Sequence, residues 1–510
     1  MRFSRRLAMT ALITALVAAA CSSTEAADGA ADDTAIGAND DGPTTTATFR
    51  TGPTVDETVP DEFAALALEE KIDQFLDTPT SPLATSIAAE MAADGDPRWG
   101  PWLLDLLRLG PSNLTDIRVA EALAVISGID RDDDNFVTDD YRIYGGWVYD
   151  QAIDPGPGYR DFKLGLYGPL DDDFESLLAS VQDDVTLSRI QWGGVPRGGI
   201  PELNEPARIT PAEADWMEPD EIVFGAVVDG EAVAYPFRIL GHHELANDTI
   251  AGNPVALVFC TLCRTALLFD RRIPADAQGD AGDGSGDELI VDLQTSGFLS
   301  NSNKIMVDIQ TDTLWSHLEG VGIGGALDGV ELAQLPLETT TWGDWLAANP
   351  DTEVLDIPDP VFPENPEQGG PAYTYKPDSP YPGYYDNPEV WFPILDTPTD
   401  DLALKDAVLG LRSGSETLAV SVDALVAEGP RVFAVGETLV LLVPNSAAGA
   451  RAYDATDTGL VDGDNPEVEA DLDAAVLADG TALPRLTVDQ GFWFAWFGNN
   501  PSTDWWPRAG

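Results

Sequence analysis

Apolar and polar positions follow two different periods along this chain, helical in the first part and strand-like in the rest. Between residues 61 and 192, apolar side chains recur at helical spacing, most clearly in the segments DPRWGPWLLDLLRLG and DIRVAEALAVISG. Gly110, Pro111 and Ser112 separate these two segments, as residues that end one helix and begin the next commonly do. The pattern predicts a pair of antiparallel helices in this region.

After about Gly193 the pattern changes to short β-rich runs separated by Gly, Asp and Asn. A Pro-rich stretch interrupts these runs, and they resume near Ala407 in an order that matches the first set. VFGAVVDGEAVAYPFRIL aligns with VLGLRSGSETLAVSVDAL, and NPVALVFCTLCRTALLFD aligns with ETLVLLVPNSAAGARAYD. Each copy also ends with the same spacing of two tryptophans, a proline and a threonine: Trp342, Trp345, Pro350 and Thr352, then Trp493, Trp496, Pro501 and Thr503. The sequence thus predicts two divergent copies of one β-rich unit.

These patterns predict an α+β fold, in which an N-terminal helical region similar to HEAT hairpins precedes a duplicated, mostly antiparallel β-rich domain. We expect six segments along the chain. They are a lipoprotein signal peptide (1–21), a disordered acidic linker rich in Thr and Ala (22–60), the helical region with its connecting segment (61–192), a first β-rich unit (193–357), a Pro-rich connection (358–399) and a degenerate second unit (400–510).

The N-terminus predicts export and lipid attachment. Three arginines precede a short apolar run that closes with Ala18-Ala19-Ala20-Cys21, a pattern that resembles a bacterial lipoprotein signal with Cys21 as the lipidated residue. We therefore expect a protein held on the extracytoplasmic face of the cell membrane, touching the membrane only through its N-terminal lipid. A plain secretory signal is the alternative.

The charge balance bears on partners. The chain has 27 basic and 88 acidic residues, a formal net charge of −61, which argues against binding nucleic acid. An exported protein is a candidate partner, and the sequence leaves the oligomeric state open.

Metal-binding and thiol side chains are gathered in one part of the chain. Apart from Cys21, the two cysteines and three histidines all lie between positions 242 and 317. Cys260 and Cys263 form a Cys-x-x-Cys pair, and His243 lies 17 residues before Cys260. A strand, a turn over AGNP and a return strand would bring His243 back beside Cys260. In the second copy Pro444 and Ala447 stand at the cysteine positions, so the repeated unit does not need these thiols to fold.

These residues also carry a resemblance to a family. The segments GGVPRGGIPELNEPAR, AVAYPFRILGHHELANDTIAGNPV, FCTLCRTALLFDRR and GFLSNSNKIMVDIQTDTLWS closely resemble the bacterial domain of unknown function 3179. The resemblance implies the fold family but no established activity. The family's His-Glu pair, its Asn-Asp pair and its Cys-x-x-Cys loop fall on His243, Glu244, Asn247, Asp248, Cys260 and Cys263.

The predicted site is a transition-metal centre. Two thiolates and one or two imidazoles form a soft donor set that suits copper or zinc, with His243, Cys260, Cys263 and His317 as the candidate ligands. We expect six further residues to orient these ligands or to line the pocket: Glu244, Asn247, Asp248, Ser300, Asn301 and Trp315. No nucleotide cofactor is expected.

Three other interpretations of the same residues stay open. The cysteines could form a thiol–disulfide redox pair, although nothing in the sequence resembles the βαβ setting of thioredoxin-type motifs. Cys260 could act as a nucleophile with His243 as base and Asp248 or Glu244 as the orienting group. The thiols could also be structural, in a cell-surface binding or scaffold protein without catalysis. The sequence does not decide whether the protein is an enzyme.

Overall fold

The computed structural model describes residues 66–130, 137–282, 286–358, 375–377, 381–445, 449–471 and 474–508. The predicted signal, Cys21 and the linker of residues 22–60 lie outside these ranges. None of the helices in the described part of the chain has the length and apolar character needed to span a bilayer.

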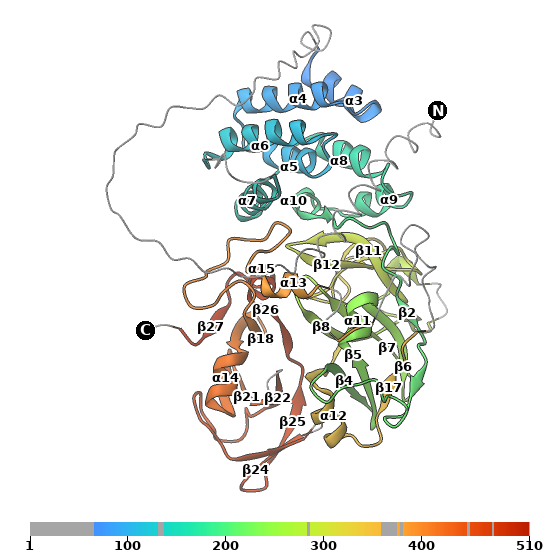
Figure 1. Ribbon diagram of the computed structural model, residues 1–510, viewed down its shortest axis with the longest axis vertical. Helices are drawn as coiled ribbons and strands as arrows, with labels where there is room; N and C mark the ends of the chain where they lie inside the picture. Colours follow the sequence, from blue (N-terminus) through green and yellow to red (C-terminus); the bar gives the residue numbers. More distant parts are fainter. Residues whose placement is uncertain are drawn as a thin grey trace, which may run out of the picture.

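The N-terminal part is helical, as predicted, and forms a separate layer beside the strands (Figure 1). Its helices are α3 (Leu68–Asp77), α4 (Ser81–Asp94), α5 (Trp99–Leu109), α6 (Asn113–Ser127), α7 (Val137–Asp150), α8 (Tyr159–Tyr167), α9 (Phe174–Ala179) and α10 (Asp184–Arg189). The predicted break at residues 110–112 falls between α5 and α6, where the Ser112 hydroxyl caps α6 by accepting from the backbone N–H of Thr115.

A buried ion pair joins the helices to the first strand. The Lys163 ammonium lies 3.1 Å from an oxygen of Asp105, and both side chains are fully buried. Lys163 also donates to the carbonyl of Ile190, and the Arg108 guanidinium donates to the carbonyl of Trp192. Breaking these bonds would leave a buried charge without a partner, which is costly in free energy. They therefore hold the helical layer in place against the strands.

In the described part of the chain, all strands but β9 and β10 form five small, mostly antiparallel sheets that are arranged as a five-bladed propeller (Figure 1). We name each sheet after one of its strands. The β12 sheet has the order β1 (Gln191–Trp192), β11 (Leu293–Ser300), β12 (Asn303–Asp308), β13 (Leu314–Ser316) and β14 (Gly322–Gly324). The β7 sheet has the order β15 (Gln334–Leu335), β8 (Thr265–Asp270), β7 (Asn253–Cys260), β6 (Leu245–Ile250) and β2 (Leu203–Asn204).

The other three sheets complete the propeller. The β4 sheet has the order β16 (Glu338–Thr341), β4 (Ile222–Val228), β5 (Glu231–Pro236), β17 (Glu353–Leu355) and β3 (Arg208–Ile209). The β18 sheet has the order β26 (Asp489–Phe492), β18 (Ala407–Ser413), β19 (Glu416–Ser421) and β27 (Asp504–Trp506). The β21 sheet has the order β20 (Arg431–Val435), β21 (Thr438–Pro444), β22 (Ala450–Asp454), β25 (Ala482–Leu486), β24 (Ala474–Leu477) and β23 (Val468–Ala470).

Short elements lie between these strands. Two strands form a separate pair, β9 (Arg272–Ile273) with β10 (Leu289–Ile290), and a single 3₁₀ turn spans Gly279–Ala281. The short helices are α11 (Phe237–His243), α12 (Trp342–Ala348), α13 (Pro382–Asp386), α14 (Val422–Glu428) and α15 (Trp493–Asn499).

The β-rich pattern predicted after about Gly193 does not continue as far as His243. Strands β4 and β5 form a hairpin over residues 222–236, but the chain then turns into α11. Pro236 precedes this helix with a φ of −64°, and Glu244 ends it in the left-handed conformation. His243 therefore lies in the last turn of a helix rather than at the end of a strand.

Candidate metal centre

The alternation of side chains along β7 sets the direction of Cys260. Val255, Leu257 and Phe259 pack in the core toward β4 and β5, whereas Ala256 and Val258 pack toward the β12 sheet. Since side chains two residues apart share a face of a strand, Cys260 follows Ala256 and Val258. The first cysteine therefore faces the β12 sheet.

The second cysteine lies in the turn that joins β7 to β8. Cys260 pairs with Thr265 across this turn, and Arg264 closes it with a φ of +54°. The carbonyl of Cys263 accepts hydrogen bonds from the backbone N–H of Phe492, at 2.9 Å, and from the Thr265 hydroxyl. The turn is thus held from the β18 sheet as well as from its own strands.

His317 and Asn303 approach the cysteines from the β12 sheet. Asn301 and Ser302 both have positive φ, which forms the tight turn between β11 and β12 and places Asn303 at the start of β12. His317 follows β13, and its backbone N–H donates to the carbonyl of Lys304. Adjacent strands of one sheet therefore supply an amide and an imidazole.

These elements bring Cys260, Cys263 and His317 together. One ligand atom from each lies within 4.8 Å of the others, and all three side chains are buried, with Cys260 at 2% exposure. Both cysteines are free thiols. A thiol pair and an imidazole at this separation could hold a metal ion.

Asn303 is a site residue that the sequence-based prediction did not name individually. Its Oδ1 accepts from the Cys263 thiol at 3.2 Å and lies 3.2 Å from Nδ1 of His317. It is the last residue of the SNSN segment, residues 300–303, a candidate polar wall of the pocket in which the prediction named Ser300 and Asn301. Asparagines are common in turns, so the sequence alone gives little reason to single this one out.

The two thiols differ in acidity. Burial raises the pKa of Cys260, but hydrogen bonds from Cys263 and His317 and the charge of His317 outweigh burial and hold that pKa well below the ordinary thiol value. Burial and the neighbouring Cys260 sulfur raise the pKa of Cys263 well above it. The arrangement therefore favours one thiolate next to one protonated thiol, a pair that a metal ion would convert to two thiolates.

A buried ion pair holds the cysteine turn through the hydroxyl of Thr261. Oε2 of Glu244 lies 2.5 Å from the Lys304 ammonium, and Oε1 accepts from the hydroxyl of Thr261, which lies between the two cysteines. The Lys304 ammonium also donates to the Thr295 hydroxyl. Glu244 thus orients the Cys-x-x-Cys turn rather than the imidazole of His243.

The structure does not bring His243 into the cluster. Its Nδ1 lies 2.9 Å from the carbonyl oxygen of Pro201, and its Nε2 lies 2.8 Å from the hydroxyl of Tyr375. Burial lowers the pKa of His243, and burial and His243 lower that of His242 to about 4. The two adjacent histidines are therefore neutral near pH 7 and pack around Tyr375.

Asn247 and Asp248, expected to orient the imidazole, bond elsewhere. The amide of Asn247 donates to the carbonyl of Leu293 and accepts from its N–H, which joins β6 to β11. Oδ2 of Asp248 accepts from the Tyr235 hydroxyl and pairs with Arg208 at 2.7 Å. Both residues tie strands together.

The three residues expected in the pocket have different positions. Ser300 is half-buried at the end of β11 and pairs with Asn303 across the turn. Oδ1 of Asn301 accepts from the backbone N–H of Leu395. Trp315 is fully buried in the core, and its indole N–H donates to Asp308.

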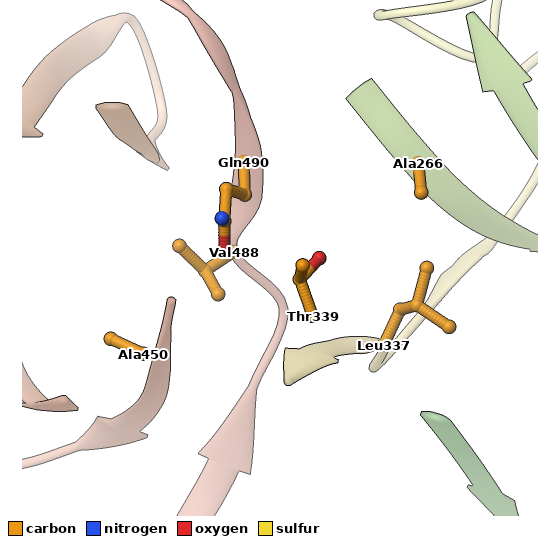
Figure 2. A pocket seen from close by; sticks show the side chains of 6 residues that line it. All are labelled: Ala266, Leu337, Thr339, Ala450, Val488 and Gln490. Carbon is orange, nitrogen blue, oxygen red and sulfur yellow. The ribbon is translucent and has the colours of Figure 1, made fainter. Parts of the chain in front are cut away.

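A small pocket lies between the two halves of the propeller (Figure 2). The empty space inside it, including space open to solvent, is about 230 Å³. It is lined by Ala266, Leu337, Thr339, Ala450, Val488 and Gln490. This lining has no ionisable side chain, so it offers no acid or base.

The comparisons with known proteins agree with the sequence motifs. Residues 197–503, which are more than half of the chain, match the model of a family described as a protein of unknown function, DUF3179. Neither a curated protein nor a solved structure matches the chain. The matched range includes the strands from β2 to β26 and every residue of the Cys260, Cys263 and His317 cluster. The chain therefore belongs to the DUF3179 family.

Proposed function

We propose that this protein binds a transition metal, copper or zinc, through Cys260, Cys263 and His317. The observation that carries the proposal is the convergence of two buried thiols and a buried imidazole within 4.8 Å, from two different sheets. Sulfur and imidazole donors prefer these ions to calcium or magnesium.

The surroundings of the cluster support a role in metal binding. The Glu244–Lys304 pair holds the turn that carries both sulfurs, and outer contacts of this kind commonly strengthen metal sites. With both thiols ionised and His317 neutral, the ligands carry two negative charges, and a divalent ion would make the complex of ion and ligands neutral. This balance suits a buried position.

We further propose that the protein works outside the cytoplasm, attached to the cell membrane by a lipid on Cys21. The residues before Cys21 support this placement, as does the large negative charge of the chain, which keeps an exported protein soluble. The helical layer, which we interpret as similar to HEAT hairpins, would then be available to an exported protein partner.

We also infer that the β4 and β18 sheets descend from one duplicated unit. In both, a strand parallel to the second hairpin strand follows a short helix, as β17 pairs with β5 and β27 with β19. The indole N–H of Trp345 donates to the Thr352 hydroxyl at 3.0 Å, and Trp496 donates to Thr503 at 3.0 Å. The repeated tryptophans and threonines thus have the same role in both sheets.

A thiol–disulfide redox function is the second candidate, because the low pKa of Cys260 and the high pKa of Cys263 are typical of an attacking thiol and its resolving partner. Access argues against it, since Cys260 is 2% exposed and Cys263 fully buried. A partner disulfide would need an opening that the described residues do not provide.

Metal analysis of the purified full-length protein tests the proposal. We expect one equivalent of copper or zinc per chain, retained in His243→Gln and lost, or bound at least about 10-fold more weakly, in Cys260→Ser and His317→Gln. The two histidine variants are matched, because both residues are fully buried and only His317 lies in the cluster. Equal metal content in both would refute the proposal. Thiols that cycle reversibly in a protein unable to bind metal would favour the redox function.

A further inference from the structure

We propose that the side-chain oxygen of Asn303 is the fourth ligand of this metal centre, which makes it a closed, four-coordinate site. The inference rests on the proposed metal-binding function and adds a residue and a coordination number to it. Asn303 is 4% exposed and lies at the start of β12, on the sheet that also positions His317.

The distances around Asn303 fit a tetrahedral centre. Its Oδ1 is 3.2 Å from the sulfur of Cys263 and 3.2 Å from Nδ1 of His317. Bonds of about 2.3 Å to sulfur and about 2.1 Å to nitrogen and oxygen give tetrahedral edges of about 3.6 Å for O–S and about 3.4 Å for O–N. The observed separations differ from these edges by a few tenths of an ångström, so little movement is needed.

Loss of the thiol proton changes what Asn303 can bind. With Cys263 protonated, its S–H donates to Oδ1. A metal-bound Cys263 is a thiolate, which has no proton to donate, so Oδ1 would lose this hydrogen bond and keep the backbone N–H of Lys304 as a donor. A cation between these atoms would accept the lone pair that Oδ1 has freed, together with one from sulfur and one from Nδ1.

The other ring nitrogen of His317 has a partner of its own. Its Nε2 lies 3.2 Å from the carbonyl oxygen of Val258, which can only accept a hydrogen bond. Metal-bound histidines usually donate their other ring N–H to such a carbonyl, which fixes the tautomer. In the metal-bound state, a proton on Nε2 would leave the Nδ1 lone pair for the ion.

The backbone holds the amide in place. Oδ1 of Asn303 also accepts from the N–H of Lys304 at 2.9 Å. This bond orients the oxygen, so that Oδ1 already has the position of a metal ligand before an ion binds. Four protein donors leave no position for water, so the centre would hold its ion rather than activate water for hydrolysis.

Cobalt(II) substitution of the full-length protein tests this coordination. The absorption of Co²⁺ reports its coordination number, and azide serves as a probe for an open position. We expect the wild-type spectrum to be that of a four-coordinate ion and to be unchanged by azide. In Asn303→Ala we expect a spectrum that shifts with azide and an affinity for Co²⁺ that falls by about 10-fold or more.

Two variants separate ligation from folding. Asn303→Asp keeps an oxygen donor, so we expect its spectrum to stay four-coordinate and insensitive to azide. Asn301→Ala removes a similarly buried amide from the same turn, one that bonds Leu395, and should leave the Co²⁺ spectrum unchanged even if the protein loses stability. A wild-type spectrum that responds to azide, or an Asn303→Ala spectrum identical to wild type, overturns the inference while the metal function stands. A wild-type protein that binds no Co²⁺, copper or zinc overturns both.

Discussion

Replacing Glu244 by Gln removes the negative partner of a buried ammonium group next to the cysteine turn. The Glu244 and Lys304 side chains are 8% and 4% exposed, and their charged atoms lie 2.5 Å apart. Glutamine preserves the size of the side chain and can still accept from Thr261. The substitution therefore tests the charge rather than the shape.

The expected magnitude follows from two opposing effects. At 2.5 Å and an effective dielectric constant of about 20, the attraction between the two charges is about 7 kcal/mol. The cost of removing both groups from water offsets much of this attraction, but removal of one partner leaves the other charge buried and unpaired. We therefore expect Glu244→Gln to lower the free energy of unfolding by about 3–5 kcal/mol.

Urea denaturation of four proteins measures the effect: wild type, Glu244→Gln, Lys304→Met and the double variant. Each single variant should lose about 3–5 kcal/mol, and the double variant should lose clearly less than their sum, because it leaves no unpaired charge. Single-variant losses that add to within about 0.5 kcal/mol would show that the pair is not coupled and would refute the reasoning. In the metal titration, we expect Glu244→Gln to weaken binding by about 10-fold, since Thr261 loses a charged partner.

Two further predictions concern packing and acid stability. A methyl group at Gly225 or at Gly410 would lie 2.1 Å or 2.0 Å, respectively, from a tryptophan ring. We therefore expect Gly→Ala at either position to lower the free energy of unfolding in urea by at least about 2 kcal/mol. Gly383→Ala is the control, because nothing lies within 4 Å of that position, and it should change stability by less than about 1 kcal/mol. Equal stabilities of the three variants would contradict the close approach. Burial lowers the pKa of His242 to about 4, from 6.5 in the unfolded chain. The contribution of neutral His242 to the free energy of unfolding is therefore fully present above pH 6.5 and is lost as the pH falls toward 4. After allowance for solvent screening this loss is about 1–2 kcal/mol, and His242→Gln should flatten the pH profile of stability between 6.5 and 4 by that amount. An unchanged profile would show that His242 is not the group responsible.

The sequence predicted the local elements where periodicity and turn residues agreed. The helices on either side of Pro111 and the hairpin that leads to Cys260 both formed as expected, because each depends on contacts between residues close in the chain. The scarcity of cysteine and histidine also located the cluster. His317 belongs to it although it lies 54 positions after Cys263, a distance over which sequence spacing carries no geometric information.

His243 shows where this approach failed. The hairpin of β6 and β7 does return the chain to this region, as the backbone N–H of Phe259 donates to the carbonyl of Glu244. However, Glu244 adopts a φ of +58°, which ends α11 and breaks the alternation that a continuous strand would have had. The side chain of His243 therefore points toward Pro201 and Tyr375. Spacing predicted that the backbones meet, but the direction of the side chain depended on one residue's conformation.

The β18 sheet contributes to the centre although it has no cysteine or histidine. The N–H of Phe492 donates to the carbonyl of Cys263, and the Tyr384 hydroxyl, from the segment before this sheet, donates to the carbonyl of Leu262 at 2.9 Å. On its other side the same turn is held by Glu244 through the hydroxyl of Thr261. The peptide groups of the turn are thus fixed from separate parts of the propeller, which sets the direction of both sulfurs before any ligand binds. It follows that the proposed metal affinity depends on the assembled propeller. The second β-rich unit has no cysteine, but metal binding needs it because its residues hold the cysteine turn of the first unit.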